Sequence, residues 1–150
     1  MRVIDDIKEL ARTYGACNKV ESINSIADAV GLLLTPQGRE FALKTGFPTY
    51  EVWREVWDLL PADEEPRING IHILVDSVRM IMHNEDAIVV GLSKLLVDFN
   101  RPDKLHHVIA MHGAEVEIQA SNHSVITVTN VGAKVSVIND GSAIVNIEKR

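Results

Sequence analysis

Six histidines are the side chains of this sequence best suited to metal chemistry, and all of them follow residue 70. Zinc sites need histidines that converge with further nitrogen, sulfur or carboxylate ligands. His112 and His123 are eleven residues apart, close to the step of a repeat in this half of the chain, so neighbouring turns of the repeat would bring them together. No cysteine pair, His-x-x-x-His helix or carboxylate at ligand spacing accompanies them, so we expect no metal and no cofactor. The six are His72, His83, His106, His107, His112 and His123.

Two acidic residues form the next candidate group. Glu115 and Glu117 alternate with apolar residues, which places both carboxylates on one polar face of a strand. Paired carboxylates are what sugar hydrolysis requires, and the amides Asn130 and Asn139 recur nearby as candidate carbohydrate contacts. The simpler interpretation is a solvated strand face, because acids on exposed faces are common.

Two tryptophans, Trp53 and Trp57, are one helical turn apart. Aromatic side chains bury large areas, so both are interpreted first as core residues or as contacts with the second half of the chain. The alternative is a binding face for a partner protein, because exposed tryptophan is enriched in interaction hot spots.

Signatures of catalysis are missing from the sequence. Cys17 is the only cysteine, so an intrachain disulfide is impossible, and no activating base for its thiol can be identified. The sequence contains no phosphate-binding loop, no Gly-x-Ser-x-Gly motif and no dinucleotide fingerprint. We therefore expect a protein that is not an enzyme, and we assign no catalytic residue.

An internal repeat is the strongest pattern in the chain. An apolar-polar-apolar triplet recurs at residues 116–118, 126–128, 135–137 and 145–147, in steps of ten, nine and ten residues. Looser copies begin at residue 71, and turn-forming residues separate the triplets. After three triplets a small or amide residue follows, and these are expected at tight corners with a left-handed backbone: Ala120, Asn130 and Asn139.

Two architectures produce short strands at this spacing. An antiparallel meander or sandwich would use hairpin turns, for which Asp140-Gly141 is suited. A short β-solenoid stacks each strand on an equivalent one, so its apolar pairs must keep phase through turns of unlike sequence. The apolar pairs of this sequence keep a constant phase from one repeat to the next, which favours the solenoid.

Residue types divide the chain into two halves. Residues 1–70 hold ten valines and isoleucines and six of the seven aromatic residues, whereas residues 71–150 hold twenty-three valines and isoleucines. Because β-branched side chains favour strands, the first half is predicted to be helical and the second to be β. The predicted organisation is α+β, with a helical domain over 1–62, a linker over 63–70 and a β-repeat domain over 71–150.

Four apolar stripes at helical spacing predict about four short helices in the first half. They span residues 4–14, 20–30, 36–46 and 50–60. Thr35-Pro36 is typical of a helix start, and Gly46 of a helix end.

The ends of a solenoid leave unpaired strand edges, which invite aggregation. We expect the helical half to cover the first edge. The charged run 148–150 would guard the second edge, or that edge is where another subunit docks.

The segments TPQGREFALKTGFPTYEVWRE and MHGAEVEIQASNHSVITVTN resemble uncharacterised proteins of gut bacteria and their phages or mobile elements. In those proteins a helical front, with a similar EF…FP element, joins a β-repeat tail. The resemblance covers most of the chain and implies a helical N-terminal part and a β-repeat C-terminal part. It implies no activity and no functional residue.

Net charge and hydropathy exclude two classes of partner from the expected function. The net charge of -6 argues against nucleic acid as a partner, and the absence of a signal-peptide core or long apolar run argues against a membrane. Cytoplasmic location is expected, with export without a leader or association with a virion left open. The leading hypothesis is a non-enzymatic structural or interaction protein that presents a β-repeat surface, with a homo-oligomeric assembly component as its expected form. The alternatives are a carbohydrate-binding or carbohydrate-acting module and a regulatory adaptor that binds a partner protein through its helices.

Overall fold

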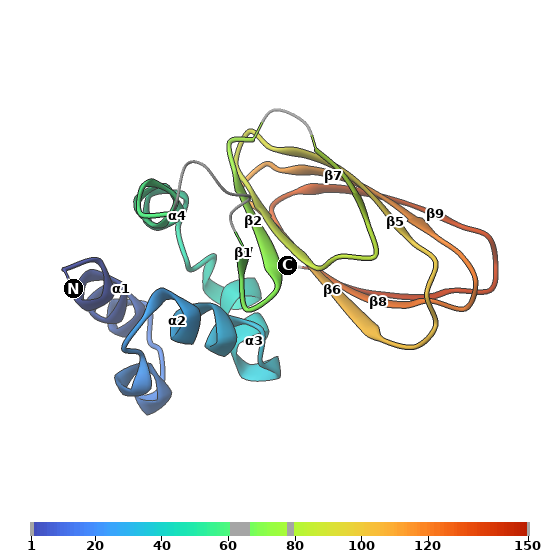
Figure 1. The fold of residues 1–150 in the computed structure, drawn as a ribbon. Helices are drawn as coiled ribbons and strands as arrows, with labels where there is room; N and C mark the ends of the chain where they lie inside the picture. The colour runs from blue at the N-terminus through green and yellow to red at the C-terminus, as the bar shows by residue number, and fades with distance from the viewer. Residues whose placement is uncertain (1, 61–66, 78–79, 150) are drawn as a thin grey trace.

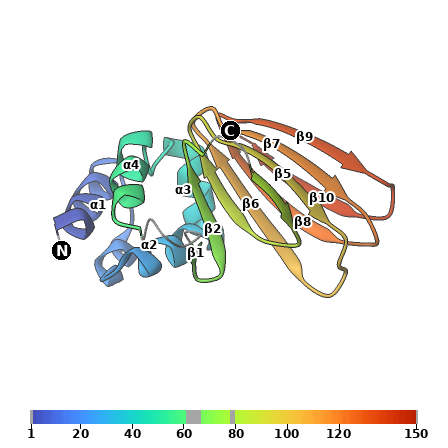
Figure 2. The same ribbon diagram turned by 45° about the horizontal axis from the view of Figure 1, so that its top comes forward.

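The structure is a computed structural model that describes residues 2–60, 67–77 and 80–149. Helices precede strands along the chain, and the strands wind into a β-solenoid of about four turns. Figure 1 shows the helices on one side of the solenoid and strand β9 on the far side, and Figure 2 shows the same order from a second direction. The α+β prediction is confirmed.

The helical part follows three of the four predicted stripes closely. Thr35 caps one helix by accepting a hydrogen bond from the Gly38 amide at 3.1 Å, and Gly46 ends it with a left-handed backbone at φ 78°. The predicted second helix is divided, because Ser25 caps a new helix by accepting from the Asp28 amide. None of the helices that the structure describes is long and apolar enough to span a membrane. The elements are α1 (Arg2–Thr13), the 3-10 helix η1 (Asn18–Ser22), α2 (Ile26–Leu33), α3 (Pro36–Thr45) and α4 (Tyr50–Asp58).

The strands form two sheets, and almost all of their pairings are parallel. The six-stranded sheet has the order β1-β2-β4-β6-β8-β10, and the four-stranded sheet has the order β3-β5-β7-β9. Only β1 and β2 pair antiparallel among the described strands, so the solenoid prediction is confirmed and the antiparallel meander is wrong. The strands are β1 (Arg67–Ile68), β2 (Ile71–Val75), β3 (Met80–His83), β4 (Ala87–Val90), β5 (Lys94–Phe99), β6 (Leu105–Met111), β7 (Glu115–Ala120), β8 (Val125–Val131), β9 (Lys134–Asn139) and β10 (Ile144–Lys149).

The ten-residue repeat of the sequence corresponds to half a coil. Successive triplets alternate between the two sheets, so each residue stacks on the one two repeats away. Val116 of β7 pairs with Val135 of β9, and Ile126 of β8 pairs with Val145 of β10. A full coil therefore takes nineteen residues at this end of the solenoid.

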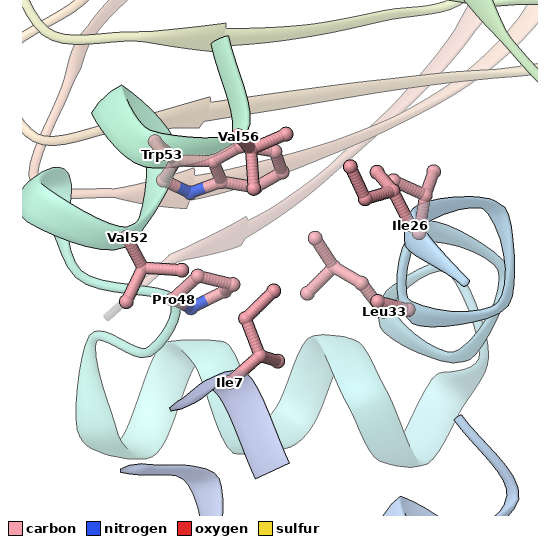
Figure 3. Close-up of a pocket in the computed structure, with 9 residues that line it drawn as sticks. Ile7, Ile26, Leu33, Pro48, Val52, Trp53 and Val56 are labelled. Carbon is pink, nitrogen blue, oxygen red and sulfur yellow. The ribbon is translucent and has the colours of Figure 1, made fainter. Parts of the chain in front are cut away.

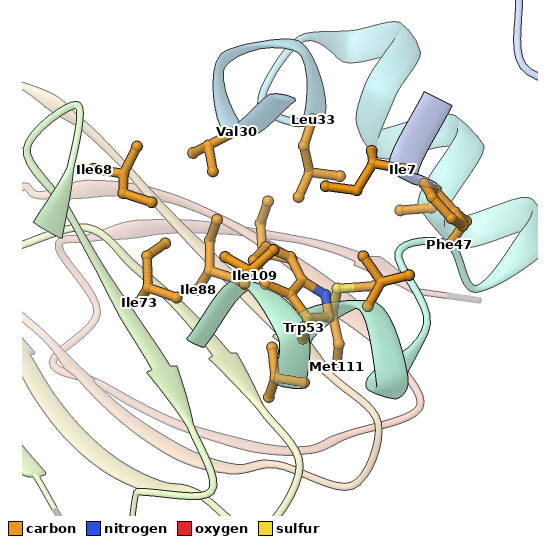
Figure 4. Close-up of a cluster of buried hydrophobic side chains, with 14 of the residues drawn as sticks. Ile7, Val30, Leu33, Phe47, Trp53, Ile68, Ile73, Ile88, Ile109 and Met111 are labelled. Carbon is orange, nitrogen blue, oxygen red and sulfur yellow. The ribbon is translucent and has the colours of Figure 1, made fainter. Parts of the chain in front are cut away.

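Two apolar cores lie on opposite sides of the six-stranded sheet. Inside the solenoid, residues such as Val89, Val108 and Ile118 are fully buried. The outward side chains of the same sheet, among them Ile88 and Ile109, form a second core with the helices. Figure 4 shows these strand residues meeting side chains of the helical part.

The first edge of the six-stranded sheet is covered by a strand as well as by helices, whereas in the four-stranded sheet no described strand pairs with the outer edge of β3. Strand β1 pairs with β2 and occupies that edge of the six-stranded sheet, and α2 contacts β1. The helices extend from there over the outer face, where α3 contacts β8. Of the predicted linker, residues 63–66 lie outside the described residues, whereas Arg67–Ile68 form β1.

One corner of each coil has a left-handed residue. Asp76, Gly91, His112 and Gly132 follow β2, β4, β6 and β8, and all have φ between 52° and 73°. The expectation of a left-handed backbone at Ala120, Asn130 and Asn139 is wrong, because these are strand residues without positive φ. The left-handed turn comes after the strand ends, where the chain must change direction.

Candidate interaction surfaces

The outer face of the four-stranded sheet is the first candidate surface. Its inward residues belong to the solenoid core, so the alternate residues point outward, away from the helices. Lys94, Glu115 and Lys134 are in register on three adjacent strands, and Lys94 Nζ lies 3.7 Å from Glu115 Oε2. We call this surface the charged face; it comprises Lys94, Leu96, Glu115, Glu117, Lys134 and Ser136, which line an open depression.

The chemistry of the charged face suits contact better than hydrolysis. Glu115 and Glu117 project in the same direction from one strand, as predicted, and their Cα atoms are about 7 Å apart. Glycosidases instead place two carboxyl groups on either side of the scissile bond. The arrangement of alternating acids and lysines can pair with polar or charged groups of a ligand.

The two candidate amides are not part of the charged face. Asn130 is 7% exposed at the end of β8, in the other sheet, and its Oδ1 accepts from the Ala133 amide at 2.8 Å. Asn139 ends β9, where its Oδ1 accepts from the Gly141 amide and its Nδ2 donates to the Ala143 carbonyl, both at 2.9 Å. Both side chains hold corners of the solenoid.

The two tryptophans lie in the core that joins the helices to the sheet. Trp53 is 2% exposed, and Figure 4 shows it between Ile109 and the helices. Trp57 is half-buried and packs against the same core. A small apolar cavity of about 30 Å³ lies beside Trp53 and is lined also by Ile7 and Leu33. Figure 3 shows these side chains. That volume is about one water molecule, so the geometry agrees with the core interpretation of Trp53.

The histidines occupy unrelated places. His112 follows β6 and His123 precedes β8, at opposite corners of a coil, so the expectation that neighbouring turns bring them together is wrong. His112 contacts the Pro48 carbonyl through Nε2 at 2.7 Å. Buried His106 places Nδ1 3.1 Å from Asp86 Oδ1 and its ring 4.6 Å from that of Phe99. Within the described residues, no group of three His, Cys, Asp or Glu side chains could hold a metal ion.

A polar cluster ties the helices to the sheet near its last strand. Arg39 of α3 pairs with Glu148 of β10 at 2.9 Å, and Glu148 also accepts from the Thr129 hydroxyl at 2.8 Å. Half-buried His107 lies beside this pair, and desolvation by burial together with the Arg39 charge lowers its pKa below 6.5. Glu148 is therefore directed at the helices and does not guard the edge of β10.

A second cluster ties α4 to the first corner of the solenoid. The Tyr50 hydroxyl donates to Asp76 Oδ2 at 2.5 Å, and Arg54 Nη1 lies 3.3 Å from the same oxygen. The hydrogen bond to Asp76 raises the pKa of Tyr50 above 10.0. Burial would raise the pKa of Asp76, but the hydrogen bonds from Tyr50 and the Leu92 amide, together with the Arg54 charge, hold that pKa below 3.8.

The last coil is the second candidate surface. β9 and β10 are the final strands of their sheets, and no described strand pairs with their outer edges. Four inward residues of these strands continue the core ladders: Val135, Val137, Val145 and Ile147. Ile147 is nonetheless 50% exposed, and the three valines are only partly buried. We call this surface the open end; its inward residues are Val135, Val137, Val145 and Ile147, with Ile138 and Ile144 exposed beside them.

The exposure of the open end was not predicted residue by residue. The sequence shows that each triplet belongs to an apolar ladder, but the exposure of the last triplets is visible only in the structure. Comparison with protein-family models, with curated proteins and with solved structures finds no match for this chain. The site is therefore interpreted from its own geometry.

Proposed function

We propose that this protein is a non-enzymatic structural protein that self-associates through the open end of its solenoid. The observation that carries the proposal is the partly exposed continuation of the core at Val135, Val137, Val145 and Ile147. Each side chain belongs to a ladder whose preceding member is buried, such as Val116 below Val135. An apolar ladder that stops at solvent gains free energy when another polypeptide covers it.

The asymmetry of the two ends supports self-association at this end. The first edge of the six-stranded sheet is occupied by β1, and the helices cover much of that sheet's outer face. Natural proteins protect exposed strand edges with charges, bulges or covering elements. On β10, Glu148 is paired with Arg39 and directed at the helices, which leaves Lys149 as the exposed charged residue of that strand among the described residues.

The test is the mass in solution, measured by light scattering on a sizing column over a range of concentrations. The proposal expects a mass above that of the 16.6 kDa chain. Ile147→Asp should return the protein to the mass of one chain, because it places a charge in the covered core. Ile81→Asp is the matched control, since Ile81 is 61% exposed on β3, remote from the open end, and should leave the mass unchanged. A wild-type protein that is monomeric at every concentration contradicts the proposal.

A second candidate function is carbohydrate binding at the charged face. The specific observation is that Glu115 and Glu117 face solvent together, in a depression that also contains Lys94 and Lys134. A glycan array tests it, with the double variant Glu115→Ala/Glu117→Ala as control. A wild-type protein that binds no glycan, or a variant that binds equally well, contradicts this candidate.

The adaptor alternative receives less support from the geometry. Trp53 is 2% exposed and Trp57 is half-buried against the same core. A partner that required both rings would have to separate α4 from the sheet. Tryptophan fluorescence that is quenched readily by iodide at both rings would favour the adaptor alternative.

A further inference from the structure

The open end supports a more specific inference, which rests on the proposed function and describes its partner. We propose that the partner is a second copy of this chain, joined end to end about a two-fold axis that passes through Val137 of β9 and Ile147 of β10. The two copies then pair β9 with β9 and β10 with β10, each antiparallel. The result is a closed dimer in which neither solenoid has an open core at this end.

The backbone of both edge strands is oriented for this pairing. The Ile144 amide donates to the Ser124 carbonyl at 2.9 Å, and the Lys134 amide donates to the Ala114 carbonyl at 2.8 Å. These amides therefore face the neighbouring strand within each sheet. Backbone groups alternate sides along a strand, so those of Val137 and Ile147, three residues further on, face the open edge. When the two-fold axis passes beside Val137 and Ile147, each of these residues forms two backbone hydrogen bonds with the same residue of the second copy.

The side chains of the open end also match themselves under this operation. Val137 pairs with Ile118 and Ile147 with Val128, so both point into the solenoid core. Each lies in the middle part of its strand, and the chain brings both strands to the same end of the solenoid. Val135 and Val145 precede them by two residues and have the same inward orientation. In this register Val137 and Ile147 meet their own copies, whereas Val135 lies opposite Asn139 of the partner subunit and Val145 opposite Lys149 of the partner subunit. The apolar contact is therefore centred on Val137 and Ile147.

The charges along β9 are complementary in the same register. A two-fold axis at Val137 places Lys134 opposite Asp140 of the partner subunit, and the symmetry repeats this pair. The Asp140 carboxylate accepts from the Ser142 hydroxyl at 2.6 Å, which holds its pKa below 3.8, so the group is ionised at neutral pH. On β10, Glu148 is neutralised by Arg39 of its own chain at 2.9 Å, which reduces repulsion between the two copies.

A head-to-tail arrangement is disfavoured by the first end of the solenoid. The edge strands there are β1, with two residues, and β3, with four, whereas β10 and β9 have six each. β1 is also antiparallel to β2, so β10 of a second copy has no parallel ladder to continue there. A contact between identical surfaces closes on itself as a dimer, whereas head-to-tail contacts produce rings or filaments.

Disulfide cross-linking tests the axis directly. In a Cys17→Ser background, Ile147→Cys places a thiol on the proposed axis, where opposed residues of an antiparallel hydrogen-bonded pair have Cα atoms about 5.5 Å apart. That distance lies in the range of disulfides. Ile144→Cys is the matched control on the same strand, 57% exposed against 50% for Ile147. Its two copies would be about 20 Å apart, six residues along a strand.

The expected result is that mild oxidation converts most of the Ile147→Cys protein to a disulfide-linked dimer and leaves the Ile144→Cys protein as single chains. Equal cross-linking of both, or no cross-linking while light scattering shows an Ile147-dependent oligomer, would overturn the two-fold register and leave the proposed function standing. A monomeric mass for the wild type together with no cross-linking would overturn both. Circular dichroism of each variant verifies that the solenoid is folded.

Discussion

Asn84 and Asn100 exchange two hydrogen bonds across a corner of the solenoid, although sixteen residues separate them. The Asn84 Nδ2 donates to Asn100 Oδ1 at 2.8 Å, and the Asn100 amide donates to Asn84 Oδ1 at 2.8 Å. Asn122 continues the column by donating through Nδ2 to the Asn100 carbonyl at 2.9 Å. Each coil is thereby tied to the next at the corner that leads from the four-stranded sheet back to the six-stranded sheet.

The asparagine column predicts a graded loss of stability. Asn84→Ala removes both hydrogen bonds with Asn100 and forces alanine into a left-handed backbone at φ 52°, so we expect a loss of about 2–3 kcal/mol in the free energy of unfolding. Asn100→Ala removes only one of them and should cost about 1 kcal/mol. Asn84→Gly keeps the backbone conformation accessible and should be less destabilising than Asn84→Ala. Urea denaturation measures all three; equal losses for alanine and glycine would contradict the backbone contribution.

The inward and outward registers predict opposite effects for neighbouring residues of β7. Ile118 is fully buried in the solenoid core, whereas Gln119 is exposed. Ile118→Asp buries a charge without a partner and should cost about 4 kcal/mol or more, enough to unfold much of the β part. Gln119→Asp, one residue along the same strand, should change stability by about 0.5 kcal/mol or less. Thermal melts followed by circular dichroism compare the two, and similar melting temperatures would show that the register is wrong.

Two glycines of the same corner column separate backbone strain from steric overlap. Gly91 and Gly132 both have left-handed backbones, with φ 71° and 73°. A Cβ at Gly91 would overlap the Asp76 carboxylate and lie 2.8 Å from Tyr50 Cε1, whereas a Cβ at Gly132 would meet nothing within 4 Å. Gly132→Ala should therefore cost about 1 kcal/mol, from the backbone alone.

Gly91→Ala should cost at least about 1 kcal/mol more than Gly132→Ala, because the added methyl displaces the Tyr50–Asp76 contact that holds α4. Chemical denaturation of both variants measures the difference. If the two alanine variants were equally stable, the close approach of α4 to this corner would be contradicted.

The lowered pKa of His107 predicts a stability that falls on acidification. Its folded-state pKa lies below 6.5, so the folded protein binds this proton less readily than the unfolded chain. The stability that neutral His107 contributes is complete above pH 6.5 and is lost as the pH falls through the folded-state pKa. Arg39 opposes protonation, whereas Asp86 and Glu148 favour it.

The matched variant for this effect is His107→Gln. The difference in unfolding free energy between wild type and variant, measured by urea titration from pH 8 to pH 5, should shift in favour of the variant below pH 6.5. A difference that stays constant over this range would contradict the lowered pKa.

The sequence by itself determined the local elements and the kind of β architecture. Thr35 and Gly46 delimit a helix through capping and a left-handed backbone, which depend on neighbouring residues only. The phase of the apolar triplets likewise identifies stacked strands and assigns Glu115 and Glu117 to the solvent side, because side chains alternate along any strand.

Only the tertiary structure decided which distant residues meet. The repeat step was visible, but not that successive triplets belong to different sheets, which separates His112 from His123. Trp53 had two interpretations until the outer face of the six-stranded sheet was seen to pack against the helices. The half-exposure of Ile147 depends on which coil lacks a neighbour, and the pairing of Glu148 with Arg39 joins residues 109 positions apart. Such contacts depend on how whole elements pack, which the pattern of any one segment does not contain.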